Sequence, residues 1–190
     1  ITQMEGYRPI LGKWLQKRFP NTVFQFVNAG ISSTCSTSGA FRLRDHVLAK
    51  GRIDLFFIEF AVNDDQDAGH THQNCIRGLE GIIRQARTLQ PHMDIICTHF
   101  VNPGMLKTLQ ETRMPLPMGA HEQVLQHYDI STNFLARELA DRIAASTMDW
   151  KTFGGTHPKK AGNAMAAEGA AKILEAAWRT PLSKDARKQA

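Results

Sequence analysis

The chain has 190 residues, of which 42% are hydrophobic and 22% charged, a composition ordinary for a globular protein with a sizeable core. Its net charge is +5, and Lys184, Arg187 and Lys188 near the C-terminus supply part of it without a basic stripe interleaved with aromatic residues. No apolar run approaches the length of a membrane span. We therefore expect one domain over residues 1–180 and a basic tail over 181–190, with no nucleic-acid partner and no membrane span.

Hydrophobic periodicity divides the chain into alternating helices and strands. Apolar residues at helical spacing predict helices over 8–18, 41–49, 74–90, 122–145 and 161–178. Short alternating or continuous apolar runs predict strands over 23–27, 54–60 and 93–100, the second of them buried on both faces. The remaining polar or proline-containing segments predict loops over 29–38, 63–72, 102–119 and 147–156.

Strands that alternate with helices predict an α/β fold, a three-layer α/β/α sandwich with a central, mostly parallel sheet. Ligand sites in such sheets form beyond the carboxyl ends of the strands, which places segments 28–38, 63–72 and 102–119 at one edge. The numbered sequence opens on Ile1-Thr2 and then a helix, so the first strand of the sheet has no candidate. We expect that strand to precede the numbered chain.

One histidine lies in a tight loop before the last predicted helix, in the sequence Gly154-Gly155-Thr156-His157-Pro158. The glycines let the backbone bend sharply, and Pro158 suits the first turn of the helix that follows. This junction is a useful place for a general base. A surface histidine that ends a loop is the structural alternative.

Three segments, taken in order, resemble the SGNH (GDSL-type) hydrolase superfamily of esterases and acetylesterases. They are Asn28-Ala29-Gly30, then Glu59-Phe60-Ala61-Val62-Asn63-Asp64, then His157-Pro158. The resemblance implies a flavodoxin-like SGNH fold in which the Gly30 N–H and the Asn63 side chain bind an oxyanion and His157 is the general base. It also implies a nucleophilic serine immediately before Ile1. Taken singly, Gly30 also fits a turn and the Asn63-Asp64 pair also fits a helix cap.

The chain departs from the family pattern at two positions. Gly154 stands where the family has an aspartate that orients the histidine, so the resemblance implies a Ser-His dyad. Asp149 is the alternative partner, although it lies eight residues upstream of His157. Ala61 replaces the glycine of the GxND block. Four serines in the loop after Gly30 are expected to line the pocket or cap a helix: Ser32, Ser33, Ser36 and Ser38.

The predicted function is a serine esterase that removes small acyl groups, acetyl first, from a carbohydrate or a similar polar alcohol, with no cofactor. We expect Arg42 and Asp64 to bind substrate, with Arg8 as a further candidate and surface ion pairs as the alternative for both arginines. His70 and His72 lack a third ligand at a set spacing, so no metal site is predicted. A non-catalytic SGNH-like binding module is the competing hypothesis. The sequence predicts neither the compartment nor the oligomeric state.

Overall fold

The computed structural model describes residues 6–179, so the predicted basic tail at 181–190 lies outside the described residues. In chain order its elements are α1 (Tyr7–Arg18), α2 (Ser36–His46), the 3-10 helix η1 (Leu48–Lys50), β1 (Leu55–Ile58), α3 (Ala61–Gln66), α4 (His72–Leu89), β2 (Asp94–Thr98), α5 (Pro103–Gln110), α6 (Leu116–His127), β3 (Ser131–Asn133), α7 (Leu135–Ala144), α8 (Trp150–Phe153) and α9 (Lys160–Ala177). The predictions for α1, α4, α9, β1 and β2 are confirmed to within a few residues.

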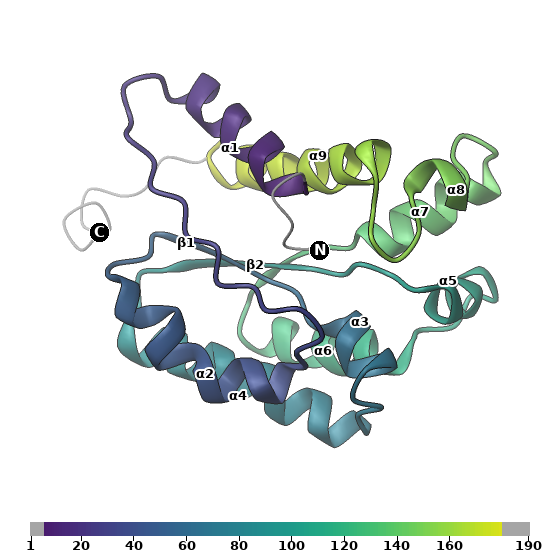
Figure 1. Ribbon diagram of the computed structural model, residues 1–190, viewed down its shortest axis with the longest axis horizontal. Coiled ribbons are helices and arrows are strands. Elements are labelled where there is room, and N and C mark those ends of the chain that lie inside the picture. Colours follow the sequence, from purple (N-terminus) through teal and green to yellow (C-terminus); the bar gives the residue numbers. More distant parts are fainter. Residues whose placement is uncertain (1–5, 180–190) are drawn as a thin grey trace.

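The three described strands form a parallel sheet in the order β1-β2-β3. Leu55 pairs with Asp94 at one end of the first ladder, and Thr98 pairs with Asn133 at the end of the second. Figure 1 shows the sheet between two helical layers, with α1, α9, α7 and α8 on one side and α2, α4, α6 and α3 on the other. The predicted α/β/α architecture is confirmed.

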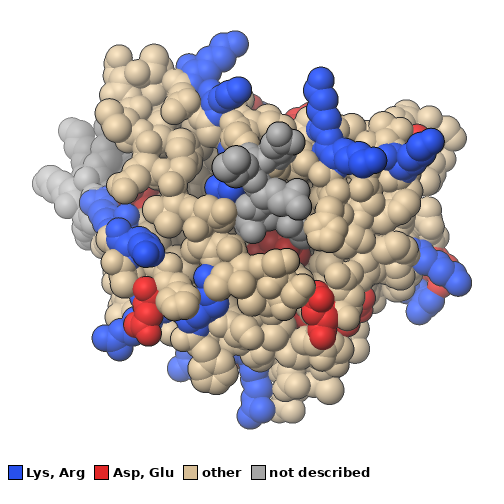
Figure 2. All heavy atoms as spheres, in the orientation of Figure 1, with Lys and Arg blue, Asp and Glu red and all other residues tan. Residues whose placement is uncertain are grey.

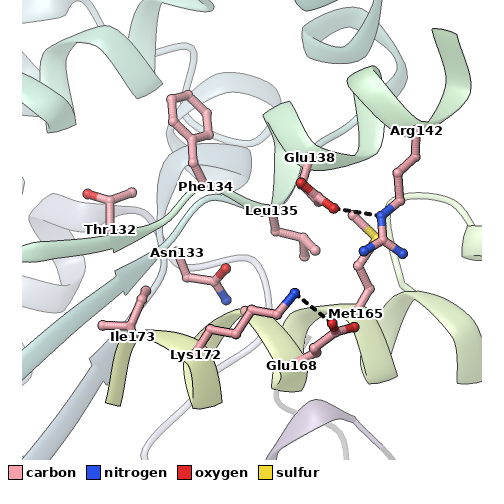
Figure 3. A pocket seen from close by; sticks show the side chains of 11 residues that line it. Thr132, Asn133, Phe134, Leu135, Glu138, Arg142, Met165, Glu168, Lys172 and Ile173 are labelled. Carbon is pink, nitrogen blue, oxygen red and sulfur yellow. Dashed lines mark hydrogen bonds and ion pairs between the residues drawn. The ribbon is translucent and has the colours of Figure 1, made fainter. Parts of the chain in front are cut away.

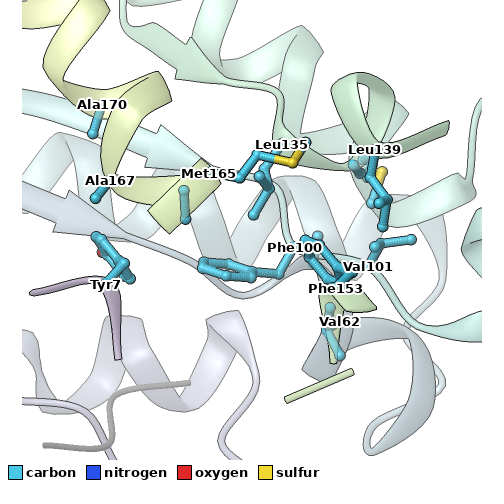
Figure 4. Close-up of a cluster of buried hydrophobic side chains, with 14 of the residues drawn as sticks. Tyr7, Val62, Phe100, Val101, Leu135, Leu139, Phe153, Met165, Ala167 and Ala170 are labelled. Atoms are coloured by element: carbon cyan, nitrogen blue, oxygen red, sulfur yellow. The ribbon is translucent and has the colours of Figure 1, made fainter. Parts of the chain in front are cut away.

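Successive side chains along the strands pack alternately into two separate hydrophobic cores. Ile96 of β2 joins the cluster built with α1, α5, α7 and α9, whereas its neighbours Ile95 and Cys97 join the cluster built with α2, α4 and α6. This alternation is the period-two pattern of a strand covered on both faces. Figure 4 shows the first cluster, in which Phe100 and Phe153 are fully buried.

Segment 23–27 does not form the predicted strand. Its backbone runs without regular secondary structure, and Val23 is 98% exposed. A strand needs a hydrogen-bonded neighbour, because isolated extended chain leaves its N–H and C=O groups to water. Within residues 6–179, β1 pairs only with β2, and a wide cavity separates its other edge from segment 23–27.

The predicted helix over 122–145 is two helices with a strand between them. The chain leaves α6 through Asp129, whose φ of 51° lies in the left-handed region, and the Ile130 N–H returns to the Leu125 carbonyl. Residues 131–133 then pair with β2 before α7 begins. Helical spacing of apolar residues on both sides of this short break made the segment look continuous.

Several segments predicted as loops contain helices. In 102–119 the prolines start helices: Pro103 occupies the first turn of α5, where the Asn102 side chain accepts from the Met105 N–H at 2.9 Å. Proline suits this position because its missing N–H has no partner there anyway. The same correction applies to 63–72, which contains most of α3, to 29–38, where α2 already begins, and to 147–156, which contains α8.

Charged side chains of both signs are distributed over the visible face of the molecule (Figure 2). Figure 2 shows Lys and Arg side chains over both helical layers, with Asp and Glu side chains between some of them. Among the residues that the structure describes, no helix is both long and apolar enough to cross a membrane.

Candidate active site

A large cavity, which we call the β1 groove, lies along the outer edge of β1. It measures about 1250 Å³ and is bounded by segment 22–34, strand β1 and parts of α1 and α9. Gly30, Asn63 and His157, which come from three distant parts of the sequence, all line it, and so does Arg42. The structure therefore brings the three predicted catalytic residues of the numbered chain to one cavity.

Asn63 lies in the first turn of α3, which begins just beyond the carboxyl end of β1. Its Nδ2 donates to the Asp67 Oδ2 at 2.7 Å, which fixes the side-chain amide and leaves its second hydrogen available. Ala61, at the start of the same helix, is fully buried in the core beneath. A short helix anchored in this way presents the Asn63 amide to the groove.

The loop around Gly30 is held by side chains on both sides. The Gly30 N–H donates to the Asn28 Oδ1 at 3.1 Å, so this predicted oxyanion donor already has an acceptor. Arg42 of α2 reaches back to donate to the Ala29 carbonyl at 2.5 Å. Arg42 thus fixes the loop while it lines the groove, and Ser32 lines the groove from the same loop.

His157 is exposed and makes no hydrogen bond to another residue in the range 6–179. The backbone alone sets its position. Gly154 and Gly155 have φ angles of 108° and 83°, and the Pro158 carbonyl accepts from the Asn163 Nδ2 at 2.7 Å. Glycine is favoured at both left-handed positions because a Cβ there is strained.

No carboxylate orients His157 in the described structure. Asp149 caps α8 instead, accepting from the backbone N–H and the hydroxyl of Thr152 at 2.8 and 2.7 Å. An aspartate at position 154 would not fit this backbone, because a Cβ there would collide with the backbone nitrogen of Lys159. The glycine is therefore part of how this loop folds.

The prediction that Asp64 binds substrate is wrong for this structure. Asp64 is fully buried and does not line the β1 groove. It accepts from the Ser36 N–H and hydroxyl, both at 2.7 Å, and from the His121 Nε2 at 2.9 Å. Burial raises the pKa of the Asp64 carboxyl, but the hydrogen bonds from His121 and Ser36 outweigh it and hold that pKa below its usual value. Asp64 ties α3 to α2 and α6.

Glu59 received no role from the sequence, although it stands next to the end of β1 and lines the groove. Its Oε1 is buried without a hydrogen-bond partner among the described residues. Burial raises the pKa of Glu59 to about 7, against the effect of the hydrogen bond from the Val62 N–H. A charged residue directly after an apolar strand was the available signal, because such a position faces the ligand edge of a parallel sheet.

A smaller cavity lies beside β3, at the opposite edge of the described sheet from the β1 groove. It measures about 210 Å³ and contains none of the predicted site residues. Figure 3 shows its two ion pairs, Arg142 with Glu138 at 2.6 Å and Lys172 with Glu168 at 2.7 Å. Each pair joins residues one turn apart on the same helix, so these charges are paired within α7 and within α9.

Residues 2–165 match the sequence profile of the GDSL-like lipase/acylhydrolase family. No curated protein matches the sequence. Three solved structures resemble the fold at low sequence identity. The first is a two-domain esterase, CEX, active on acetylated mannans, with a TM-score of 0.71 and 24% identity over 89% of this chain, which spans only 42% of that protein.

The second is a variant of Axe2, an acetyl xylan esterase from Geobacillus stearothermophilus, with a TM-score of 0.72 and 17% identity over 89% of this chain and 81% of that one. The third is LAE5, an alpha/beta hydrolase from the metagenome of Lake Arreo, Spain, with a TM-score of 0.73 and 17% identity over 90% and 82%. At these identities the structures establish the shared fold.

Proposed function

The chain belongs to the GDSL-like lipase/acylhydrolase family, and we propose that it is a serine esterase that removes small acyl groups, acetyl first, from a carbohydrate or similar polar alcohol. The observation that carries the proposal is the convergence of Gly30, Asn63 and His157 on the β1 groove. The acetylated mannans and acetyl xylan named for the esterases of similar fold support the choice of substrate.

The nucleophile in this proposal is a serine immediately before Ile1, at the end of a strand that lies in the β1 groove. The outer edge of β1 supports this placement, because no strand in the described part of the chain pairs with it and its backbone groups can receive a further parallel strand. Leu55, Phe56 and Phe57 are only partly buried beside the groove and would gain cover from such a strand. The strand would end at the same edge of the sheet as Asn63.

The reaction would proceed through an acyl-enzyme. The serine Oγ attacks the acyl carbon while His157 takes the hydroxyl proton, and the ester C–O bond then breaks as His157 returns that proton to the leaving alcohol. Water then attacks the acyl-serine, again losing its proton to His157. The acid is released, and the serine oxygen recovers its proton.

The negative oxygen of each tetrahedral intermediate would be held by Asn63 and by the Gly30 N–H. The second amide hydrogen of Asn63 is available for this, whereas Gly30 must first exchange its bond to Asn28 Oδ1. Each donor of this kind lowers the barrier for acyl transfer by about 3–4 kcal/mol. Because no carboxylate within residues 6–179 is bonded to His157, we assign the base to a Ser-His dyad in which the glycine loop positions the backbone of the histidine.

The test is hydrolysis of a chromogenic acetyl ester by the protein at its natural length and by its His157→Ala variant. We expect kcat/KM to fall by about 10²–10⁴, the usual range for loss of a general base. His92→Ala is the matched control, because His92 is also exposed but lies before β2, at the opposite end of the sheet. Equal rates for wild type and His157→Ala would contradict the assignment.

A non-catalytic binding module for acylated carbohydrate is the second candidate. Two observations favour it: Gly154 stands where the family has the orienting aspartate, and the Gly30 N–H is already bonded. The residue that precedes Ile1 distinguishes the esterase from the binding module. If that residue is neither serine nor another nucleophile, the site has no group that can attack the ester. Intact mass and N-terminal sequencing of the natural protein identify that residue.

A further inference from the structure

A cluster of side chains that can bind a metal lies between the N-terminus of α2 and α3, and it includes none of the groups proposed for ester hydrolysis. Cys35 precedes α2, Asp64 lies in α3, and His70 follows α3. The Cys35 Sγ, a carboxylate oxygen of Asp64 and a ring nitrogen of His70 all lie within 4.8 Å of one another. From sequence, His70 was paired with His72 and had no third ligand. The structure supplies two other ligands.

The contact between His70 and Asp64 has the spacing of two ligands on one ion. His70 Nδ1 lies 3.3 Å from Asp64 Oδ1, yet this buried nitrogen has no hydrogen-bond partner among the described residues. Two ligand atoms, each about 2.0–2.1 Å from a tetrahedral Zn²⁺, stand about 3.3–3.4 Å apart. An ion between them would satisfy the orphaned nitrogen, which otherwise costs the free energy of an unmade hydrogen bond.

Cys35 is disposed to act as a thiolate. The hydroxyls of Thr37 and Ser38 lie 3.1 and 3.4 Å from its sulfur. Thiolate is the form of cysteine that binds metals. The side chain is also partly exposed, which gives an ion a path from solvent.

A neighbouring group of three, Asp64, Cys75 and His121, has a different character. All three side chains are fully buried, and His121 Nε2 already donates to Asp64 at a hydrogen-bonding distance of 2.9 Å. This second group is an internal hydrogen-bond network that holds the carboxylate in place. The Cys35 side of Asp64 is the one that solvent can reach.

We propose that Cys35 Sγ, Asp64 Oδ1 and His70 Nδ1 form a binding site for one Zn²⁺ or similar borderline-soft divalent cation, with water in the fourth position. The mixed sulfur, nitrogen and oxygen ligands match the preference of this ion. Such an ion would join the N-terminus of α2 to α3 and to the chain that follows α3. It would therefore stabilise the segment that carries Asn63, without contacting the proposed reacting atoms.

The test is a titration of the full chain, reduced and freed of metal, with Cd²⁺, followed by the ultraviolet charge-transfer band of a cadmium thiolate. Zn²⁺ affinity is then measured by competition with a chromophoric chelator. We expect one equivalent of either ion, a Tm raised by Zn²⁺, and a band that disappears in Cys35→Ser. Loss of one ligand in His70→Ala should weaken Zn²⁺ binding by about tenfold or more.

His72→Ala is the matched control and should bind as wild type does, since its exposed side chain is outside the cluster. Circular dichroism checks that each variant folds, and Cys35→Ala replaces Cys35→Ser if the serine variant does not. The proposal is overturned if no band forms, if the band survives without Cys35, or if His70→Ala binds Zn²⁺ as tightly as wild type. The last result would make the His70 contact an ion pair alone. None of these measurements involves ester hydrolysis.

Discussion

The two sides of the candidate active site are built in opposite ways. On the α3 side, Asn63 is bonded to Asp67, and its neighbour Asp64 is locked by hydrogen bonds to two other helices. On the other side, exposed His157 is placed only by a glycine turn and the backbone around it. The α3 side is therefore fixed by its own hydrogen bonds, whereas His157 retains its side-chain freedom. Loss of the buried Asp64 carboxylate should therefore cost the most stability, whereas replacement of the exposed His157 side chain should spare the fold.

Asp64→Ala gives the largest expected loss of stability. The change leaves the Ser36 N–H and the buried His121 without their acceptor, and breaking a buried charged network in this way costs about 3–5 kcal/mol. Urea unfolding measures the loss in the free energy of unfolding. Asp45→Ala, an exposed carboxylate on α2, should change that free energy by less than about 0.5 kcal/mol. A small loss for Asp64→Ala would show that this side of the site is not locked as described.

Asn63→Ala tests function on the same side. We expect kcat for a chromogenic acetyl ester to fall by about 10²–10³, as it does when one oxyanion donor is removed. Asn63→Asp keeps the size of the side chain but removes the amide donor, and it should be as slow as the alanine variant. Full activity in either variant would remove Asn63 from the oxyanion site.

A substitution at Gly154 tests the other side of the site, where the backbone conformation sets the position of His157. Gly154→Ala should lose about 2 kcal/mol or more of stability, because the new Cβ is strained at positive φ and also meets Lys159. Gly155→Ala is the matched control, since its φ is also positive but its Cβ has nothing nearer than 3.9 Å. Chemical denaturation of both should show the larger loss at Gly154. Equal losses would mean that backbone strain alone explains the glycine pair.

Glu59, which also lines the β1 groove, should make the free energy of unfolding depend on pH. Its pKa in the folded protein is about 7, compared with an ordinary value of 4.5, so unfolding releases a proton between these values. Stability contributed by the neutral carboxyl is present at low pH and is lost as pH rises through this window. Relative to Glu59→Gln, the wild type should lose about 2–3 kcal/mol between about pH 5 and pH 8. Parallel stability curves for the two proteins would contradict the raised pKa.

Periodic apolar patterns predicted the elements whose buried face is set locally. Helices α1, α4 and α9 and strands β1 and β2 lie close to where the sequence placed them, because each presents one continuous apolar stripe or run. The incorrect predictions occur where a single residue or a contact distant in sequence determines the secondary structure. Asp129 ends a helix through a single left-handed turn, and Pro103 begins a helix where the sequence predicts a loop.

The candidate site shows the same division. The motifs named Gly30, Asn63 and His157, and all three line the β1 groove, since parallel topology brings loops at the carboxyl ends of strands together. Burial of Asp64 was not predictable from its motif, because its partners lie 28 and 57 residues away in α2 and α6. The bond from the Gly30 N–H to Asn28 was also missed, although a turn of this kind is a local feature of asparagine.

The outer edge of β1, with which no strand within residues 6–179 pairs, has a consequence for how molecules of this protein meet one another. Across the groove from it, Phe26, Val27 and Ile31 are each at least half exposed. A bare strand edge beside apolar side chains is a template onto which a strand from another molecule can add. The proposed nucleophile strand would cover the same backbone groups. A chain that fills its own groove would thus gain both a reactive serine and protection against aggregation, and loss of that strand would affect solubility together with catalysis.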